Sequence, residues 1–141
     1  MKKKILIVVA NYYENIARSL LNSAKSRIKN KYIIRVINVP GAFEIPVTIS
    51  KNLTKFNGFI ALGCVIKGQT PHFDLICNSS FKAILDLSII YNKPIGNGII
   101  TALNKKQAYQ RSGKIKSKRP NKGVEAVNAI LSILKYGLKK T

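Results

Sequence analysis

The sequence predicts an α/β fold, a three-layer sandwich in which helices cover both faces of a four-stranded parallel sheet. Short apolar runs of strand length alternate along the chain with longer segments whose apolar residues recur at helical spacing. The first run, residues 3–10, is almost continuously apolar, as expected of a strand buried on both faces. Strands that alternate with helices in this way indicate a parallel sheet.

The elements are expected in the order β-α-β-α-β-α-β-α-α. We expect strands at residues 3–10, 32–39, 59–66 and 95–101, and helices at about 16–29, 46–55, 71–91, 105–111 and 121–139, the last with Leu138 on its apolar face. Gly96-Asn97-Gly98 is expected to interrupt the fourth strand, because glycines inside a strand suggest close approach of a ligand or of another backbone.

Length and composition narrow the class of protein. The 141 residues predict a single domain spanning 1–141, and no apolar run approaches the roughly 20 residues needed to cross a membrane. The basic and apolar start resembles a signal peptide but lacks a cleavage site, so we interpret it as a core strand. Cys64 and Cys77 lie in apolar surroundings and are expected to be reduced, which favours a cytoplasmic protein without membrane association.

The formal net charge of +20 raises the alternative of a basic nucleic-acid-binding module. Most of the cations are lysines scattered along the chain, and basic and aromatic residues do not interleave on one expected face. We therefore favour scattered surface lysine and predict no nucleic-acid partner. Residues 114–119, KIKSKR, form the one dense local cluster.

The stretch from Gly63 to Cys77, GCVIKGQTPHFDLIC, predicts an anion site where the third strand meets the next helix. Thr70 is expected to cap that helix and Pro71 to occupy its first turn, so that free backbone N–H groups face the loop. His72 is the only histidine and can transfer protons near neutral pH. The same pattern also fits a ligand-free helix start with a structural histidine, and both interpretations stay open on these residues alone.

Glu44 follows the turn VPGAFEIP and allows two interpretations. An acid at a helix start suits the helix dipole, and a carboxylate at a strand end can also accept hydrogen bonds from a polyol or an amine. We find no glycine-rich dinucleotide motif, Walker A motif or metal-ligand spacing, so no metal and no nucleotide cofactor is expected.

The motifs VPGAFEIP, ALGCVIKGQTPHFD, PIGNGIIT and NKGVEA, in this order, closely resemble the lumazine synthase family. The resemblance implies a four-stranded parallel sheet, and we expect the strand order 2-1-3-4. It implies condensation of 5-amino-6-(D-ribitylamino)uracil with 3,4-dihydroxy-2-butanone 4-phosphate, without a cofactor, in riboflavin biosynthesis. The product would be 6,7-dimethyl-8-ribityllumazine, with release of phosphate and water.

The resemblance also implies residue roles. The pyrimidine and ribityl chain would be bound by Tyr12, Ala42, Phe43, Glu44, Cys64, Val65, Ile66 and Asn97. The phosphate would be bound by Gln69, Thr70 and Arg111. His72 would transfer protons, with Asp74 and Lys122 in supporting roles.

The resemblance further implies a homo-oligomer with sites between neighbouring subunits, and it allows a functional hand-off to riboflavin synthase. Asn11 replaces an arginine that is frequent in the family, and the segment between Arg111 and Asn121 is longer and more basic than in many relatives. Icosahedral shells in the family need a tight kink there, so we expect a pentamer instead. A structural assembly without activity is a further alternative, which the set Glu44, Thr70, His72 and Arg111 argues against.

Overall fold

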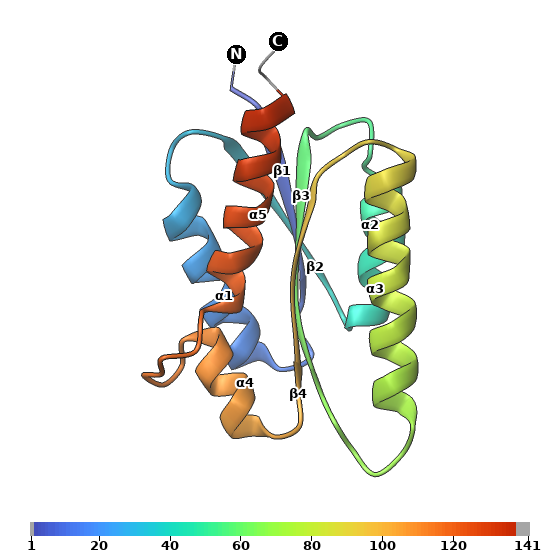
Figure 1. Cartoon of the computed structure of the whole chain (residues 1–141), viewed down its shortest axis with the longest axis vertical. Helices are drawn as coiled ribbons and strands as arrows, with labels where there is room; N and C mark the ends of the chain where they lie inside the picture. Colours follow the sequence, from blue (N-terminus) through green and yellow to red (C-terminus); the bar gives the residue numbers. More distant parts are fainter. Residues whose placement is uncertain (1, 138–141) are drawn as a thin grey trace.

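The computed structural model describes residues 2–137 and contains a parallel four-stranded sheet (Figure 1). Its strands are β1 (Lys4–Ala10), β2 (Ile33–Val39), β3 (Gly58–Ile66) and β4 (Ile95–Ala102). They lie in the order β2-β1-β3-β4, and every neighbouring pair is parallel. Both the predicted architecture and the predicted strand order are confirmed.

Helices cover both faces of this sheet. They are α1 (Glu14–Ile28), the short 3₁₀ helix η1 (Ala42–Glu44), α2 (Ile45–Ser50), α3 (His72–Ile90), α4 (Lys105–Ser112) and α5 (Lys122–Gly137). Figure 1 shows α1, α4 and α5 on one face and α2 and α3 on the other. The three layers are therefore helices, sheet and helices, as the alternating pattern predicted.

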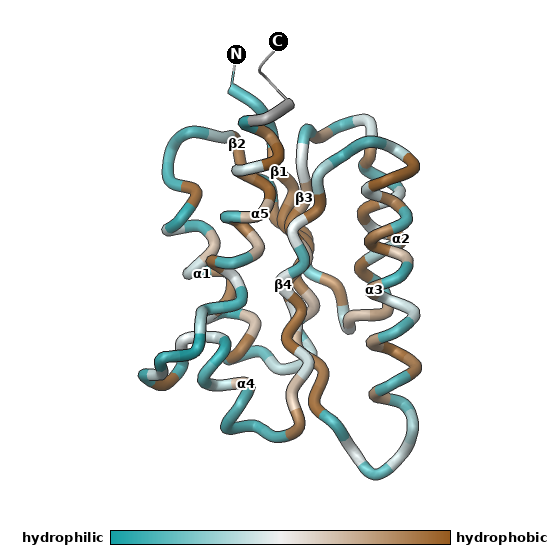
Figure 2. Tube along the Cα trace, in the orientation of Figure 1, coloured by the Kyte–Doolittle hydropathy of each residue, from teal (hydrophilic) through white to brown (hydrophobic). Residues whose placement is uncertain are grey.

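The two central strands supply side chains to both layers. Alternate residues of β1 point to opposite faces, so Ile5 and Ile7 pack against α1 and α5, whereas Leu6 and Val8 pack against α2 and α3. All four are fully buried, and each such side chain contributes about 1.5–3 kcal/mol relative to an exposed one. The hydropathy trace shows the apolar colour concentrated along the strands of the sheet, and also on parts of the helices (Figure 2).

The predicted interruption of the fourth strand is wrong, since β4 runs unbroken from Ile95 to Ala102. Its glycines instead admit the neighbouring helix. A Cβ atom at Gly96 would overlap the carbonyl oxygen of Ala126 in α5, and one at Gly98 would lie 2.5 Å from Cδ2 of Leu62. Close approach of another backbone, one of the two explanations offered for these glycines, is therefore what the structure contains.

Several helix boundaries differ from those predicted. Helix α1 begins at Glu14, and α2 ends at Ser50, with turns at 51–55. Helix α3 begins at His72 because the carbonyl of Pro71 accepts the first bond, from the backbone N–H of Leu75 at 3.2 Å. Pro71 thus holds the capping position and no side chain caps the helix, so the prediction for Thr70 is wrong. Leu138 lies outside the described residues. None of the helices within residues 2–137 is long and apolar enough to span a membrane.

Candidate functional site

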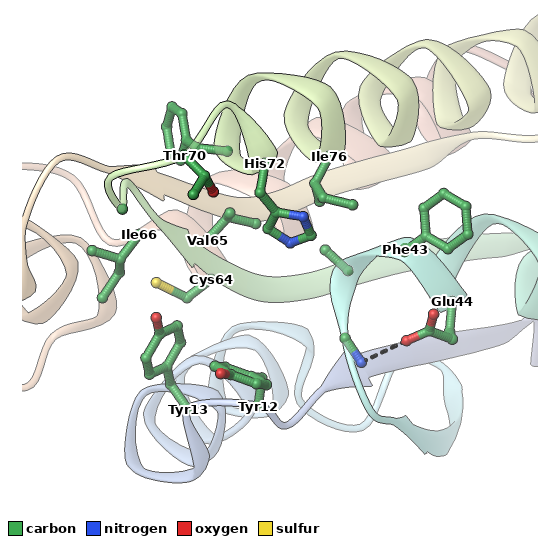
Figure 3. Close-up of a pocket in the computed structure, with 14 residues that line it drawn as sticks. Tyr12, Tyr13, Phe43, Glu44, Cys64, Val65, Ile66, Thr70, His72 and Ile76 are labelled. Atoms are coloured by element: carbon green, nitrogen blue, oxygen red, sulfur yellow. Dashed lines mark hydrogen bonds between the residues drawn. The ribbon is translucent and has the colours of Figure 1, made fainter.

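A cavity of about 510 Å³ opens where the carboxyl ends of β1 and β3 meet η1 and the start of α3. This is the edge at which parallel α/β sheets bind ligands. Its walls come from three stretches that are distant in the sequence, at residues 12–13, 41–44 and 64–76 (Figure 3). The lining residues are Tyr12, Tyr13, Gly41, Ala42, Phe43, Glu44, Cys64, Val65, Ile66, Gly68, Thr70, His72, Phe73 and Ile76.

Most of the residues expected to bind the pyrimidine and ribityl groups meet in this cavity, together with Thr70 and His72. Tyr12 lies in the loop after β1, with three quarters of its surface exposed. Ala42 is buried, whereas Phe43 is exposed beside it. The end of β3 also lines the cavity. Cys64 is the last buried residue of that strand, and Val65 and Ile66 after it are half-buried. The cavity therefore offers an exposed aromatic face and a strand end together.

Glu44 has a structural role in addition to its place in the cavity wall. Its Oε1 accepts a hydrogen bond from the backbone N–H of Gly41 at 2.9 Å, which closes the turn that begins η1 (Figure 3). Glu44 thus lies at a helix start, as the structural interpretation expected, and the contact it makes there is this turn-closing hydrogen bond. Because Glu44 also lines the cavity and only Oε1 is used in this bond, Oε2 is available to a ligand, and the binding role stays a prediction.

His72 is the first residue of α3, and its imidazole points into the cavity (Figure 3). The side chain is exposed. Asp74 is also exposed, and among the described residues it makes no hydrogen bond to His72, so an orienting contact between the two is not formed here. The ring nitrogens face the cavity, so they can exchange a proton with a molecule bound there.

Burial raises the pKa of two groups in the cavity wall. The pKa of the Cys64 thiol rises to about 12, mainly because the strand end buries it and secondarily because of the nearby Cys77. Burial, and then the proximity of Cys64 and Tyr12, raises the pKa of the Tyr13 hydroxyl. Both groups are protonated and neutral near pH 7. Cys64 and Cys77 are free thiols, as predicted.

The remaining expected residues lie outside the cavity wall. Arg111 and Lys122 belong to α4 and α5, neither of which contributes to the lining. Gln69 is exposed in the loop between Gly68 and Thr70, which do line the cavity. Asn97 lies in the edge strand β4, opposite Ala61 of β3, and its Oδ1 accepts from the N–H of Ile99 at 3.0 Å. Asn97 is the third residue of β4 and does not line this cavity, so its expected binding role stays a prediction.

Arg111 is the centre of a separate cluster of charged groups. Its Nη1 donates to the carbonyl of Pro120 at 2.6 Å, and its two terminal nitrogens contact the Glu125 carboxylate at 3.3 and 3.2 Å. Lys122 Nζ lies 3.7 Å from the same carboxylate. This paired geometry fixes the plane of the guanidinium and leaves it further N–H donors for an anion.

The family assignment rests on comparison with known proteins. The family model described as 6,7-dimethyl-8-ribityllumazine synthase matches residues 2–137. Proteins with that name are similar over nearly the whole chain: one from Bartonella tribocorum is 42% identical over 99% of this chain and 93% of its own length. One from Agrobacterium fabrum is 40% identical over 99% and 96%, and one from Bartonella henselae 40% over 99% and 90%. This chain belongs to the lumazine synthase family.

The lumazine synthase motifs predicted most of the residues that line the cavity, but not all of them. Tyr13, Gly41, Phe73 and Ile76 also line the cavity and were given no site role from the sequence. Each is next to a residue that was predicted, or one helical turn from it, so extending the predicted set to chain neighbours and to the next helical turn would have found them. Within residues 2–137, no three His, Cys, Asp or Glu side chains gather in a way that could hold a metal ion.

Proposed function

We propose that this protein is an active lumazine synthase, a transferase that condenses 5-amino-6-(D-ribitylamino)uracil with 3,4-dihydroxy-2-butanone 4-phosphate. The observation that carries the proposal is one cavity holding Tyr12, Glu44 and His72, which come from three separate segments of a lumazine synthase chain. They supply a stacking face, a hydroxyl acceptor and a proton carrier, the three things that this condensation needs.

The pyrimidine stacks on Tyr12, and its polar edge meets the end of β3. Glu44 Oε2 accepts from ribityl hydroxyls while Oε1 stays bonded to Gly41. The phosphate binds at the loop before α3, where the first backbone N–H groups of a 19-residue helix and the Thr70 hydroxyl face the cavity. The two reactants are thereby held side by side, which is itself a large part of catalysis.

His72 moves protons in each of three steps. The 5-amino group attacks the ketone and water leaves, giving a Schiff base. The C–O bond to phosphate then breaks as the proton on the neighbouring carbon is removed, and phosphate departs as the leaving group. The enol that remains takes up a proton at its terminal carbon and loses its hydroxyl proton, which gives the second carbonyl. The ribitylamino nitrogen finally attacks the second carbonyl, and loss of water closes the ring. A histidine can donate and accept at each of these stages near neutral pH.

Arg111 and Lys122 act in the cavity of a neighbouring subunit. They line no part of this chain's own cavity, so we propose a homo-oligomer, a pentamer rather than a shell, whose sites join one subunit's cavity to the next subunit's α4–α5 cluster. A broad apolar face supports this, since Phe43, Val47, Leu75, Leu85, Ile89 and Ile90 are all more than half exposed. Exposed apolar surface of this kind marks protein contacts. The enzyme acts in the cytoplasm and hands its product to riboflavin synthase.

The deciding experiment is an absorbance assay for lumazine formation from the two substrates. Wild-type protein that forms no lumazine would refute the proposal. Sedimentation should give a particle of five times the chain mass of 15.7 kDa, and a capsid-sized particle in light scattering would refute the pentamer.

Shared sites are tested by mixing two variants. Tyr12→Ala damages the cavity and Arg111→Ala the charged cluster, so each homo-oligomer should be nearly inactive. When the two chains are co-expressed equally, about a quarter of the sites pair two intact halves, and about a quarter of the wild-type activity should return. The chain carrying both substitutions, co-expressed with either single variant, is the control and should restore nothing. Activity that stays at the level of the separate variants would show that each site is built from one chain.

A further inference from the structure

Tyr12 needs support that its own surroundings do not supply. It lies in the loop Asn11–Tyr13 and is 75% exposed, and its hydroxyl has no hydrogen bond to any described residue. Exposed side chains change rotamer within picoseconds to nanoseconds. An aromatic ring that is to stack on a heterocycle binds more tightly when its plane is already fixed.

Tyr13 contacts that ring directly. The two ring centroids lie 5.0 Å apart with an interplanar angle of 83°, an edge-to-face pair within the favourable range for aromatic side chains. A near-perpendicular pair leaves at least one face of Tyr12 uncovered by its neighbour. Figure 3 shows both rings below the cavity, with the Tyr13 hydroxyl directed toward Cys64.

Tyr13, unlike Tyr12, is anchored to the protein. Its ring is half-buried and packs against the hydrophobic cluster between the sheet and helices α1 and α5. Its backbone carbonyl accepts from the N–H of Ala17 at 2.9 Å, the bond that begins α1. Burial also raises the pKa of its hydroxyl, which agrees with a ring held against the protein.

We propose that Tyr13 is a positioning residue of this site, whose anchored ring holds the plane of Tyr12 for stacking on the substrate's heterocycle. The inference rests on the proposed function and adds a residue that the family motifs did not mark. The ring, and not the hydroxyl, performs this task, because the contact is between the two aromatic systems.

Two substitutions separate ring from hydroxyl. Tyr13→Phe keeps the edge-to-face contact, so its KM values should stay within about twofold of wild type. Tyr13→Leu removes the contact and should raise KM for the pyrimidine substrate about three- to tenfold, the range of an aromatic pair. KM for the phosphate substrate should not change. A Tyr13→Leu enzyme with normal pyrimidine KM, or a Tyr13→Phe enzyme as impaired as the leucine variant, would overturn the inference.

A double-mutant cycle tests whether Tyr13 acts through Tyr12. In a Tyr12→Leu background, Tyr13→Leu should change the pyrimidine KM less than twofold, because no aromatic plane remains to be held. Equal effects in both backgrounds would mean general damage and would refute positioning.

Tyr32→Leu is the matched control, since Tyr32 is also half-buried against the same cluster but does not line the cavity. It should leave both KM values unchanged. If Tyr13→Leu does not fold by thermal melting, Tyr13→Met, which keeps more of the buried volume, replaces it with the same expectations. Failure of the proposed function would appear differently, as a wild-type protein that forms no lumazine.

Discussion

The cavity beside α3 and the charged cluster around Arg111 differ in how far their polar side chains are hydrogen-bonded within the protein. Among the described residues, the side chains of Thr70 and His72 make no hydrogen bond, and both are exposed. The guanidinium of Arg111 instead donates to Pro120 and to both oxygens of Glu125. The first region leaves its groups free for a reaction, whereas the second fixes one cation in advance. The difference teaches that one protein can keep some polar side chains open to a ligand while it fixes the geometry of another in advance.

The largest expected effect comes from disturbing the close packing of β4 against α5, because α5 carries part of the charged cluster. Gly96→Ala would push a Cβ into the Ala126 carbonyl of α5, the helix that carries Glu125. We expect a loss of about 3 kcal/mol in the free energy of unfolding, at the upper end for overpacking, measured by chemical denaturation. Activity per folded protein should fall as well, because the Glu125 contact to Arg111 shifts.

Gly68→Ala is the matched control in the cavity loop. A Cβ there would meet nothing within 4 Å, so the free energy of unfolding should stay within about 0.5 kcal/mol of wild type. Equal losses for the two alanine variants would contradict the contrast between a packed region and an open one.

Next in size is the loss of proton transfer. His72→Ala should lower kcat on the order of a hundredfold, the lower end of the usual contribution of a general acid–base group. It should not abolish turnover, because the two reactants are still held together. Steady-state kinetics measure this, with Asn78→Ala, exposed on α3 and outside the cavity wall, as the control. A His72→Ala enzyme with the wild-type rate, or with no rate at all, would contradict the assignment.

The smallest expected effect concerns the basic loop that adjoins Arg111. Lys114, Lys116, Lys118 and Arg119 are all exposed, and the only acid between residues 111 and 125 is Glu125, which is already paired. Replacing all four by glutamine should raise KM for the phosphate substrate about threefold at low salt. The difference should vanish near 1 M salt, where the screening length falls to about 3 Å.

The control for the loop removes the same charge elsewhere. Lys25, Lys31, Lys51 and Lys55 are exposed and lie outside the α4–α5 region, so their replacement by glutamine should leave KM unchanged. An equal effect from both sets would mean that net charge alone matters. Salt-sensitive, tight binding of RNA that is lost only in the loop variant would favour the nucleic-acid alternative for this surface.

The sequence predicted the sheet well because its signal is local. An apolar run such as residues 4–10 can be recognised within one segment, and the strand-end rule then gathers Tyr12, Glu44 and His72 at one edge. Details that depend on distant partners were missed. Whether Gly96 breaks a strand or admits a helix depends on Ala126, thirty residues later.

The candidate site was predictable to a similar extent. Reasoning from single segments found most of the residues that line the cavity. It did not find the ion-pair partner of Arg111, because Glu125 lies fourteen residues away across a loop. That Asn97 lies outside the cavity wall could not be predicted, because the strand register that sets it opposite Ala61 is a property of the folded sheet. Tyr13 was missed because it occupies a helix start, where its side chain could equally have pointed to solvent.

The sulfur atom of Cys64 has a chemical consequence for the working life of the protein. Thiolates attack electrophilic carbonyl compounds, and the second substrate of the family's reaction is a ketone. With a pKa of about 12, the thiol is ionised in only about one molecule in 100,000 at pH 7. Sulfur can therefore line this cavity through many turnovers without being alkylated, and resistance to self-inactivation should fade as the solution becomes strongly alkaline.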